Sequence, residues 1–251
     1  MTIVSDLGSL SDVGELANAL PENDLAAAEA ARQRQDTLTK PPGALGRLEE
    51  IAIFMAGWQR TDRPSLEPAQ AIVFAGNHGV CAQGVNPFPQ AVTAQMVANF
   101  QAGGAAINQL CRVSGADLTV IPLDLERPTA DFTVADALSE KDCLESMRRG
   151  AAAVNPEADI LVLGEMGIGN STVAAATAFL GFGGSAKDWV GPGTGSDDAG
   201  IERKVDVLKK AAERGAKRTG MDILAAIGGR EQAAICGAVL EARRHSIPVL
   251  L

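Results

Sequence analysis

Short hydrophobic runs alternate with longer helical patterns along most of this chain. Apolar runs of strand length, bounded by glycine, proline or polar residues, cover residues 71–75, 118–123, 160–163 and 247–251. Segments with helical composition and spacing lie between them, over 90–110, 139–154, 173–180, 196–215 and 230–244. Strands that alternate with helices form right-handed βαβ units. The pattern therefore predicts an α/β fold with a Rossmann-like, mostly parallel sheet and helices on both faces.

The first sixty residues lack this alternation. Helical patterns over 24–36 and 45–58 are separated by Lys-Pro-Pro-Gly at residues 40–43, a turn that an α-helix cannot cross. We therefore predict two parts: a small helical subdomain over residues 1–60 and a Rossmann-like nucleotide-binding domain over residues 61–251.

Composition and charge narrow the class of partner. The chain has 251 residues and a net charge of −9. This charge argues against general binding to nucleic acids or membrane surfaces, because both require a basic face on the protein. No apolar run has the length of a membrane span, and the N-terminal residues do not resemble a signal peptide. The 4 cysteines lie far apart without a Cys-x-x-Cys pair. These features predict a cytoplasmic protein with reduced thiols and no metal site, whose partners are small-molecule substrates.

The segment after the strand at 160–163 carries the clearest chemical signal. Residues 164–172 read Gly-Glu-Met-Gly-Ile-Gly-Asn-Ser-Thr and lead into a helix. Such a turn presents backbone N–H groups to an anion at the carboxyl end of a strand, where this fold class binds ligands. Its spacing matches neither the dinucleotide fingerprint nor a P-loop. Glu165 therefore indicates an acid/base or orienting role at a phosphorylated small-molecule site, and the alternative is a tight turn with a solvated glutamate.

Three further loops allow two interpretations each. Glycines over 191–195 precede the helix that carries Lys204, which suits a phosphate partner or a solvated helix face. His78 follows the strand at 71–75, and a role in holding the loop is favoured over catalysis. The Gly-Gly turn at 228–229 opens another helix and is equally compatible with tight packing.

Five segments in order resemble one enzyme family. Residues 38–49, 76–80, 92–96, 164–172 and 227–229 are similar to motifs of the nicotinate-nucleotide–dimethylbenzimidazole phosphoribosyltransferases of cobalamin biosynthesis. The resemblance implies transfer of phosphoribose from nicotinate mononucleotide to 5,6-dimethylbenzimidazole, with α-ribazole 5′-phosphate and nicotinate as products. It also implies a homodimer that uses neither a metal nor a cofactor.

The resemblance also implies roles for particular residues. Glu165 matches an active-site glutamate, and Lys204 matches a phosphate-binding lysine. Phe88 and Met96 fall where the family contacts the benzimidazole, and the two prolines beside Phe88 suit an apolar slot for a flat ring. The remaining expected substrate-binding residues are Gly167, Ile168, Gly169, Asn170, Gly193, Gln95 and His78.

The end of the chain departs from the family pattern. Family members continue beyond the position of Leu251, into a Gly-Glu-Gly loop that carries their proposed general base. We therefore expect either a phosphoribosyltransferase whose activity is impaired in this form, or a non-catalytic protein that binds a nucleotide or a benzimidazole.

Overall fold

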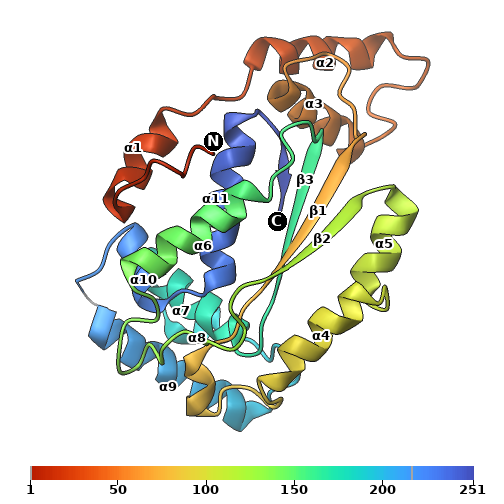
Figure 1. Ribbon diagram of the computed structural model, residues 1–251. Helices are drawn as coiled ribbons and strands as arrows, with labels where there is room; N and C mark the ends of the chain where they lie inside the picture. Colours follow the sequence, from red (N-terminus) through yellow and green to blue (C-terminus); the bar gives the residue numbers. More distant parts are fainter. Residues whose placement is uncertain (1, 216) are drawn as a thin grey trace.

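A parallel sheet lies at the centre of the protein, with helices packed around it (Figure 1). The computed structural model describes residues 2–215 and 217–251. Within them, β1 (Ala69–Ala75) pairs in parallel with β2 (Asp117–Pro122) and with β3 (Ile160–Met166), and β3 pairs with β4 (Val249–Leu250). The strand order is β2-β1-β3-β4. The predicted α/β fold with a parallel sheet is confirmed.

The helices connect these strands and cover the sheet. Those before β2 are α1 (Val13–Asn18), α2 (Leu25–Thr37), α3 (Arg47–Gln59), α4 (Ala91–Gln101) and α5 (Ala106–Ser114). Those after it are α6 (Glu140–Ala152), α7 (Asn170–Phe182), α8 (Ala186–Trp189), α9 (Asp198–Gly215), α10 (Met221–Ile227) and α11 (Arg230–Arg244). Short 3-10 turns lie at Leu10–Asp12 and Gly79–Gln83.

The tightest helix contact is between α6 and α11, which lie side by side against the sheet (Figure 1). A Cβ atom at Gly150 of α6 would collide with the carbonyl of Ala234, and one at Gly237 of α11 would collide with the carbonyl of Met147. Glycine therefore permits the close approach of the two backbones. The helix α11 packs against the central strands, and its alanines share one core cluster with Ile72 and Phe74 of β1, which are fully buried.

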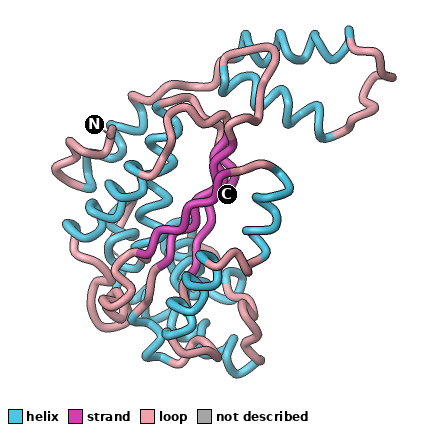
Figure 2. Tube along the Cα trace, turned by 45° about the vertical axis from the view of Figure 1, so that its right-hand side comes forward, coloured by secondary structure: helices cyan, strands magenta, loops and turns pink. Residues whose placement is uncertain are grey.

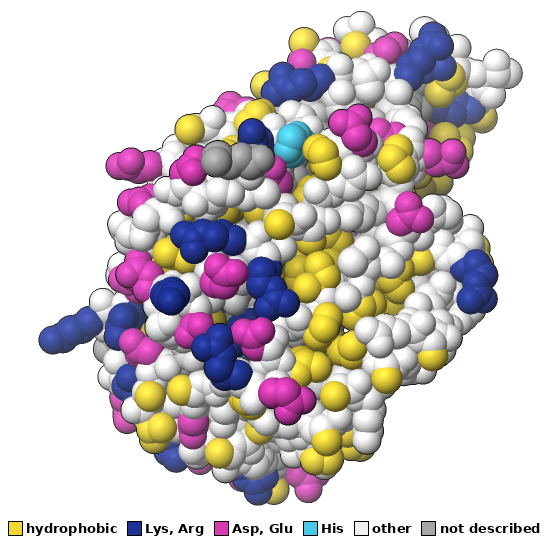
Figure 3. Space-filling model, viewed as in Figure 1, with side chains coloured by type: hydrophobic (Ala, Val, Ile, Leu, Met, Phe, Trp, Pro, Cys, Tyr) yellow, Lys and Arg dark blue, Asp and Glu magenta, His cyan; other side chains and the backbone are white. Residues whose placement is uncertain are grey.

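The other side of the sheet is covered less completely. The strand β2 is partly exposed along its length, and α4 and α5 pack beside it. Apolar side chains gather in the hollow between α6 and the α4–α5 pair (Figure 3). Leu110 and Val113 of α5 are exposed.

Several predicted elements differ from the observed ones. The single helix predicted over 90–110 is wrong: α4 ends at Gln101, Gly103 adopts a φ of 78°, and α5 begins at Ala106. A positive φ is incompatible with a continuous helix. The terminal strand is shorter than predicted, since only Val249–Leu250 pairs with β3. The helices α1, α8 and α10 were not predicted.

The N-terminal region packs in two places. Val4, Leu10 and Val13 are buried in one cluster with Leu144 of α6 and Leu240 of α11. The α2–α3 hairpin instead lies at one end of the molecule (Figure 2). The subdomain boundary predicted at residue 60 stays a prediction.

Candidate functional site

The carboxyl ends of β1 and β3 place two glycine-containing loops side by side. Ala75 is the register partner of Met166, and the N–H of Gly76 continues the ladder by donating to the carbonyl of Met166 at 2.9 Å. The β3 loop then turns at Gly169, whose φ of 92° a residue with a side chain rarely adopts, and α7 begins at Asn170. The turn predicted from the sequence is therefore present at the carboxyl edge of the sheet.

A cavity of about 240 Å³ opens beside this turn. Six of the predicted site residues lie together in its wall: Gly167, Ile168, Gly169, Asn170, Gly193 and Lys204. The other lining residues are Val85, Asn86, Pro87, Met166, Ser171, Thr194 and Ser196. Loops that are distant in sequence thus converge on one concave surface, as small-molecule sites require.

Lys204 is the buried cation of this cavity. The residue is 3% exposed, and its Nζ donates to the carbonyl of Gly191 at 3.1 Å. Burial lowers the pKa of its ammonium group below the usual value. An ammonium group has three donors, so an acceptor in the cavity can bind those that Gly191 does not use. The N-terminus of α7, which favours negative charge, lines the same cavity.

Glu165 lies on β3, one residue before the cavity wall begins at Met166. Both of its carboxylate oxygens accept from Nδ2 of Asn170, at 2.6 and 2.7 Å. The residue is solvent-exposed, yet desolvation of the carboxyl raises its pKa. Asn170 opposes the shift by its hydrogen bonds. The arrangement holds the carboxylate in one orientation and makes it a better proton acceptor.

The residues predicted to bind the base lie elsewhere. Phe88 is 46% exposed, Gln95 is exposed and Met96 is half-buried, and these three are not among the residues that line the Lys204 cavity. A second cavity of about 210 Å³ adjoins the first. It shares Val85, Asn86, Pro87 and Ser196 with the Lys204 cavity. The loop before α4 therefore forms a wall common to both cavities.

His78 is fully buried beneath the β3 loop and does not face a cavity. Its backbone carbonyl accepts from Nε2 of Gln90, a contact that does not involve the imidazole, so the predicted role of the ring in holding the loop stays a prediction. Its ring lies 3.4 Å from Oε1 of Glu231, which is also fully buried. Glu231 is a polar residue of this region that the sequence did not single out. The one signal was its place after the Gly-Gly turn, which was also compatible with simple packing.

The described residues hold no cluster of three or more metal-ligating side chains. Within that same part of the chain, no helix is both long and apolar enough to cross a membrane. The four cysteines are free, and burial raises the pKa of each thiol, to about 12 for Cys143 and about 11 for Cys236.

Comparisons with known proteins identify the family of this chain. A model of a phosphoribosyltransferase family matches residues 20–251. The chain is 58% identical over 245 residues to the nicotinate-nucleotide–dimethylbenzimidazole phosphoribosyltransferase of Rhodobacter capsulatus, a match that covers 98% of this chain and 73% of the relative. The chain belongs to this family. It is also 54% identical to the Novosphingobium aromaticivorans enzyme of the same name, over 99% of this chain and 74% of that enzyme.

Solved structures of this phosphoribosyltransferase family share the fold. The crystal structure of CobT from Thermus thermophilus matches with a TM-score of 0.81 and 36% identity, over 89% of this chain and 73% of that one. A crystal structure of the phosphoribosyltransferase from the same organism matches with a TM-score of 0.80 and 35% identity, over 90% of this chain and 73% of that one. The resemblance seen in the sequence is confirmed, and these similarities favour the enzyme over the non-catalytic binding protein.

Proposed function

We propose that this protein transfers phosphoribose from nicotinate mononucleotide to 5,6-dimethylbenzimidazole. The products are α-ribazole 5′-phosphate and nicotinate, in the lower-ligand branch of cobalamin biosynthesis. The observation that carries the proposal is the buried ammonium of Lys204, which shares a cavity with the N-terminus of α7 while Glu165 lies at the adjoining strand end. The ammonium and the helix N-terminus suit an anionic nucleotide, and the carboxylate of Glu165 suits a heterocycle that loses a proton.

Lys204 binds the 5′-phosphate in this proposal. Nζ is held by the carbonyl of Gly191, and the first residues of α7 line the same cavity. A charge-assisted hydrogen bond from a desolvated ammonium to a phosphate oxygen is stronger than a neutral one. Gly167, Ile168, Gly169, Asn170 and Gly193 form the surrounding nucleotide wall. The phosphate is thereby fixed and the ribose directed toward the β3 loop.

Glu165 orients the incoming base and receives its proton. One nitrogen of the imidazole ring attacks C1′ with inversion, the C1′–N bond to nicotinate breaks, and nicotinate leaves with the bonding electrons. The proton on the other ring nitrogen must be removed as the new bond forms. The raised pKa of Glu165 and its fixed position beside Asn170 suit this transfer.

The base lies in an apolar slot near Phe88 and Met96, with Gln95 as a further member of the substrate site. His78, which the sequence also placed among the substrate-binding residues, is fully buried and lies beneath the loop instead of lining a cavity. Phe88 is 46% exposed and Met96 is half-buried, so both side chains have surface that a flat ring can cover. The benefit of such burial is about 25 cal/mol per Å² of apolar area. The adjoining cavities along residues 85–87 support a path from this slot to the nucleotide.

The protein acts as a cytoplasmic homodimer without a metal or cofactor. Exposed apolar side chains on α3 and near β4 support association, since large exposed apolar patches mark interaction surfaces. They are Leu48, Ile51, Phe54, Leu66 and Leu250. Sedimentation analysis that finds only monomers at micromolar concentration contradicts the dimer.

A product assay tests the proposed reaction. Purified protein is incubated with nicotinate mononucleotide and 5,6-dimethylbenzimidazole, and nicotinate and α-ribazole 5′-phosphate are separated by chromatography. We expect equal amounts of both products, and none when either substrate is omitted. Release of nicotinate without α-ribazole 5′-phosphate indicates hydrolysis and contradicts the proposal, as does the absence of both products.

A further inference from the structure

His78 and Glu231 are two titratable side chains sealed beneath the β3 loop. Each is 0% exposed, and Nε2 of His78 lies 3.4 Å from Oε1 of Glu231. Within the described part of the chain, neither ring nitrogen and neither carboxyl oxygen has a partner at hydrogen-bonding geometry. The proposed reaction requires no chemistry from this pair. Buried polar groups without other partners are rare in folded proteins and call for an explanation.

Close packing places the pair between α11 and the loop. A Cβ atom at Gly76 would lie 2.5 Å from Oε2 of Glu231, so the carboxyl fills the space of that missing side chain. A Cβ atom at Gly167 would lie 2.8 Å from Nε2 of His78. The glutamate thus contacts the end of β1, and the imidazole lies against the first glycine of the cavity wall.

Hydrogen bonds to the core hold the residues on either side of Gly167. The carbonyl of Met166 accepts from the N–H of Gly76 at 2.9 Å. The N–H of Ile168 donates to Oγ1 of Thr93 at 3.1 Å, and Sγ of Cys81 donates to the carbonyl of Ile168 at 3.1 Å. Both contacts hold Ile168. The ring of His78 supports the preceding residue, Gly167, and so sets the direction in which the chain leaves Glu165.

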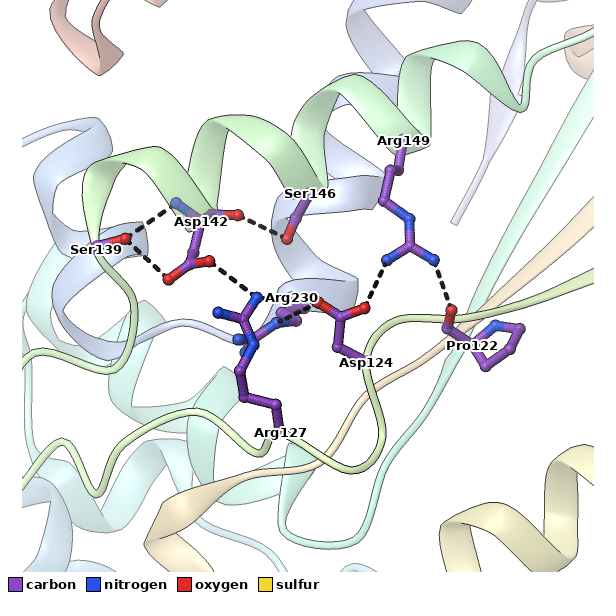
Figure 4. Close-up of polar contacts among 8 residues, drawn as sticks. All are labelled: Pro122, Asp124, Arg127, Ser139, Asp142, Ser146, Arg149 and Arg230. Atoms are coloured by element: carbon purple, nitrogen blue, oxygen red, sulfur yellow. Dashed lines mark hydrogen bonds and ion pairs between the residues drawn. The ribbon is translucent and has the colours of Figure 1, made fainter.

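The surroundings disfavour an ion pair between the two side chains. Burial raises the pKa of Glu231 to about 7 and lowers the pKa of His78 to about 4. A single 3.4 Å contact cannot offset the desolvation of two full charges. The charged groups that act on the pair are Glu165 and Arg230. Arg230 is itself compensated by Asp124, at 3.9 Å (Figure 4).

We propose that Glu231 is a positioning residue: as a neutral carboxylic acid it donates a hydrogen bond to Nε2 of His78, whose ring holds Gly167 and thereby the orientation of Glu165. The neutral state also keeps a second negative charge away from Glu165. The inference rests on the proposed function of Glu165, but the protonation state of the pair can be measured without any turnover.

Nitrogen-15 NMR of the histidine rings tests the protonation state directly. The chain contains 2 histidines, so a His245→Gln variant assigns both sets of signals. At pH 6 we expect a neutral His78 ring with its proton on Nδ1, because Nε2 accepts from Glu231. An imidazolium ring, or a neutral ring with its proton on Nε2, overturns the proposal. Because no substrate is present, this result is independent of the proposed reaction.

Matched variants test the positioning role. Glu231→Gln retains a neutral donor of similar shape, and we expect its kcat at pH 6 to stay within about threefold of the native value. Glu231→Ala removes the support, and we expect kcat to fall about tenfold or more while KM for nicotinate mononucleotide changes less than about threefold.

Between pH 6 and pH 8 the kcat of the unsubstituted protein should fall relative to that of Glu231→Gln, as Glu231 ionises. A glutamine variant as inactive as the alanine variant, or parallel pH profiles, contradicts the role.

Discussion

Two groups of charged side chains lie near the carboxyl edge of the sheet, and they differ in how their charges are compensated. In the first, Asp124 accepts from Arg127 at 3.0 Å and from Arg149 at 3.2 Å, and Asp142 accepts from Arg127 at 3.0 Å (Figure 4). These side chains are partly exposed. In the second group, Lys204 and Glu231 are almost completely buried. Lys204 makes one hydrogen bond, to the carbonyl of Gly191, and the carboxyl oxygens of Glu231 have no partner at hydrogen-bonding geometry in the described part of the chain.

The difference separates a structural role from a functional one. Exposed ion pairs that satisfy one another connect the β2 end to α6 and leave little binding capacity for a ligand. A buried group with unused hydrogen-bonding capacity costs free energy unless a ligand or a proton occupies it. We therefore expect substitutions in the second group to change activity or proton binding, and substitutions in the first group to change only stability.

The largest expected effect is at Glu165. Glu165→Gln keeps the shape and the contact with Asn170 but removes the proton acceptor. Because a positioned base contributes about 10²–10⁴-fold, we expect kcat to fall by this amount. The midpoint of urea unfolding should change little, since the side chain is exposed. Native activity in this variant contradicts the proposed role.

The buried pair should give stability a distinctive pH dependence. Between about pH 4.5 and pH 6.5 the unfolded chain holds one proton on the histidine, and the native protein holds one on the glutamate. The numbers of bound protons are equal, so the pair adds no pH dependence to the free energy of unfolding of the unsubstituted protein. This holds only while both side chains are present.

Single variants of the pair should reveal opposite slopes. In His78→Gln the raised pKa of Glu231 remains, so the native state binds more protons than the unfolded chain. Stability relative to the native protein should then fall by about 3 kcal/mol as the pH rises from about 4.5 to 7. In Glu231→Gln the lowered pKa of His78 remains, and relative stability should rise from about pH 4 to 6.5. Urea unfolding at several pH values measures both slopes, and curves parallel to the native one contradict the account.

Lys204 gives the next largest effect. Removing one charge-assisted hydrogen bond costs about 1.5–3 kcal/mol, so Lys204→Ala should weaken nicotinate mononucleotide binding about tenfold or more. Lys209→Ala is the matched control, because Lys209 lies on the same helix but its side chain is 62% exposed and its contact is Asp206. Calorimetry should show unchanged affinity for the control. Equal losses in both variants would assign the effect to net charge and not to the cavity.

The sequence predicted one member of the buried group, Lys204, and missed the other, Glu231. The order of strands and helices followed from periodicity, and the Gly-Glu-Met-Gly turn and Lys204 followed from local glycine patterns and the family resemblance. Glu231 could not be found in this way, because an acidic residue in the first turn of a helix is also typical of a solvated helix start. Its burial depends on the close approach of α6 and α11, which the glycines at 150 and 237 permit. Local patterns do not report such a non-local contact.

The smallest expected effect is in the compensated group. Arg127 is 61% exposed and bridges Asp124 and Asp142. Exposed ion pairs contribute little to stability and are screened by salt, so Arg127→Ala should lower the unfolding free energy only slightly. The loss should shrink at high salt, and kcat and the affinity for nicotinate mononucleotide should be unchanged. A change in either beyond about threefold would show that the compensated group also acts on the site, because a purely structural ion pair leaves both constants unaltered.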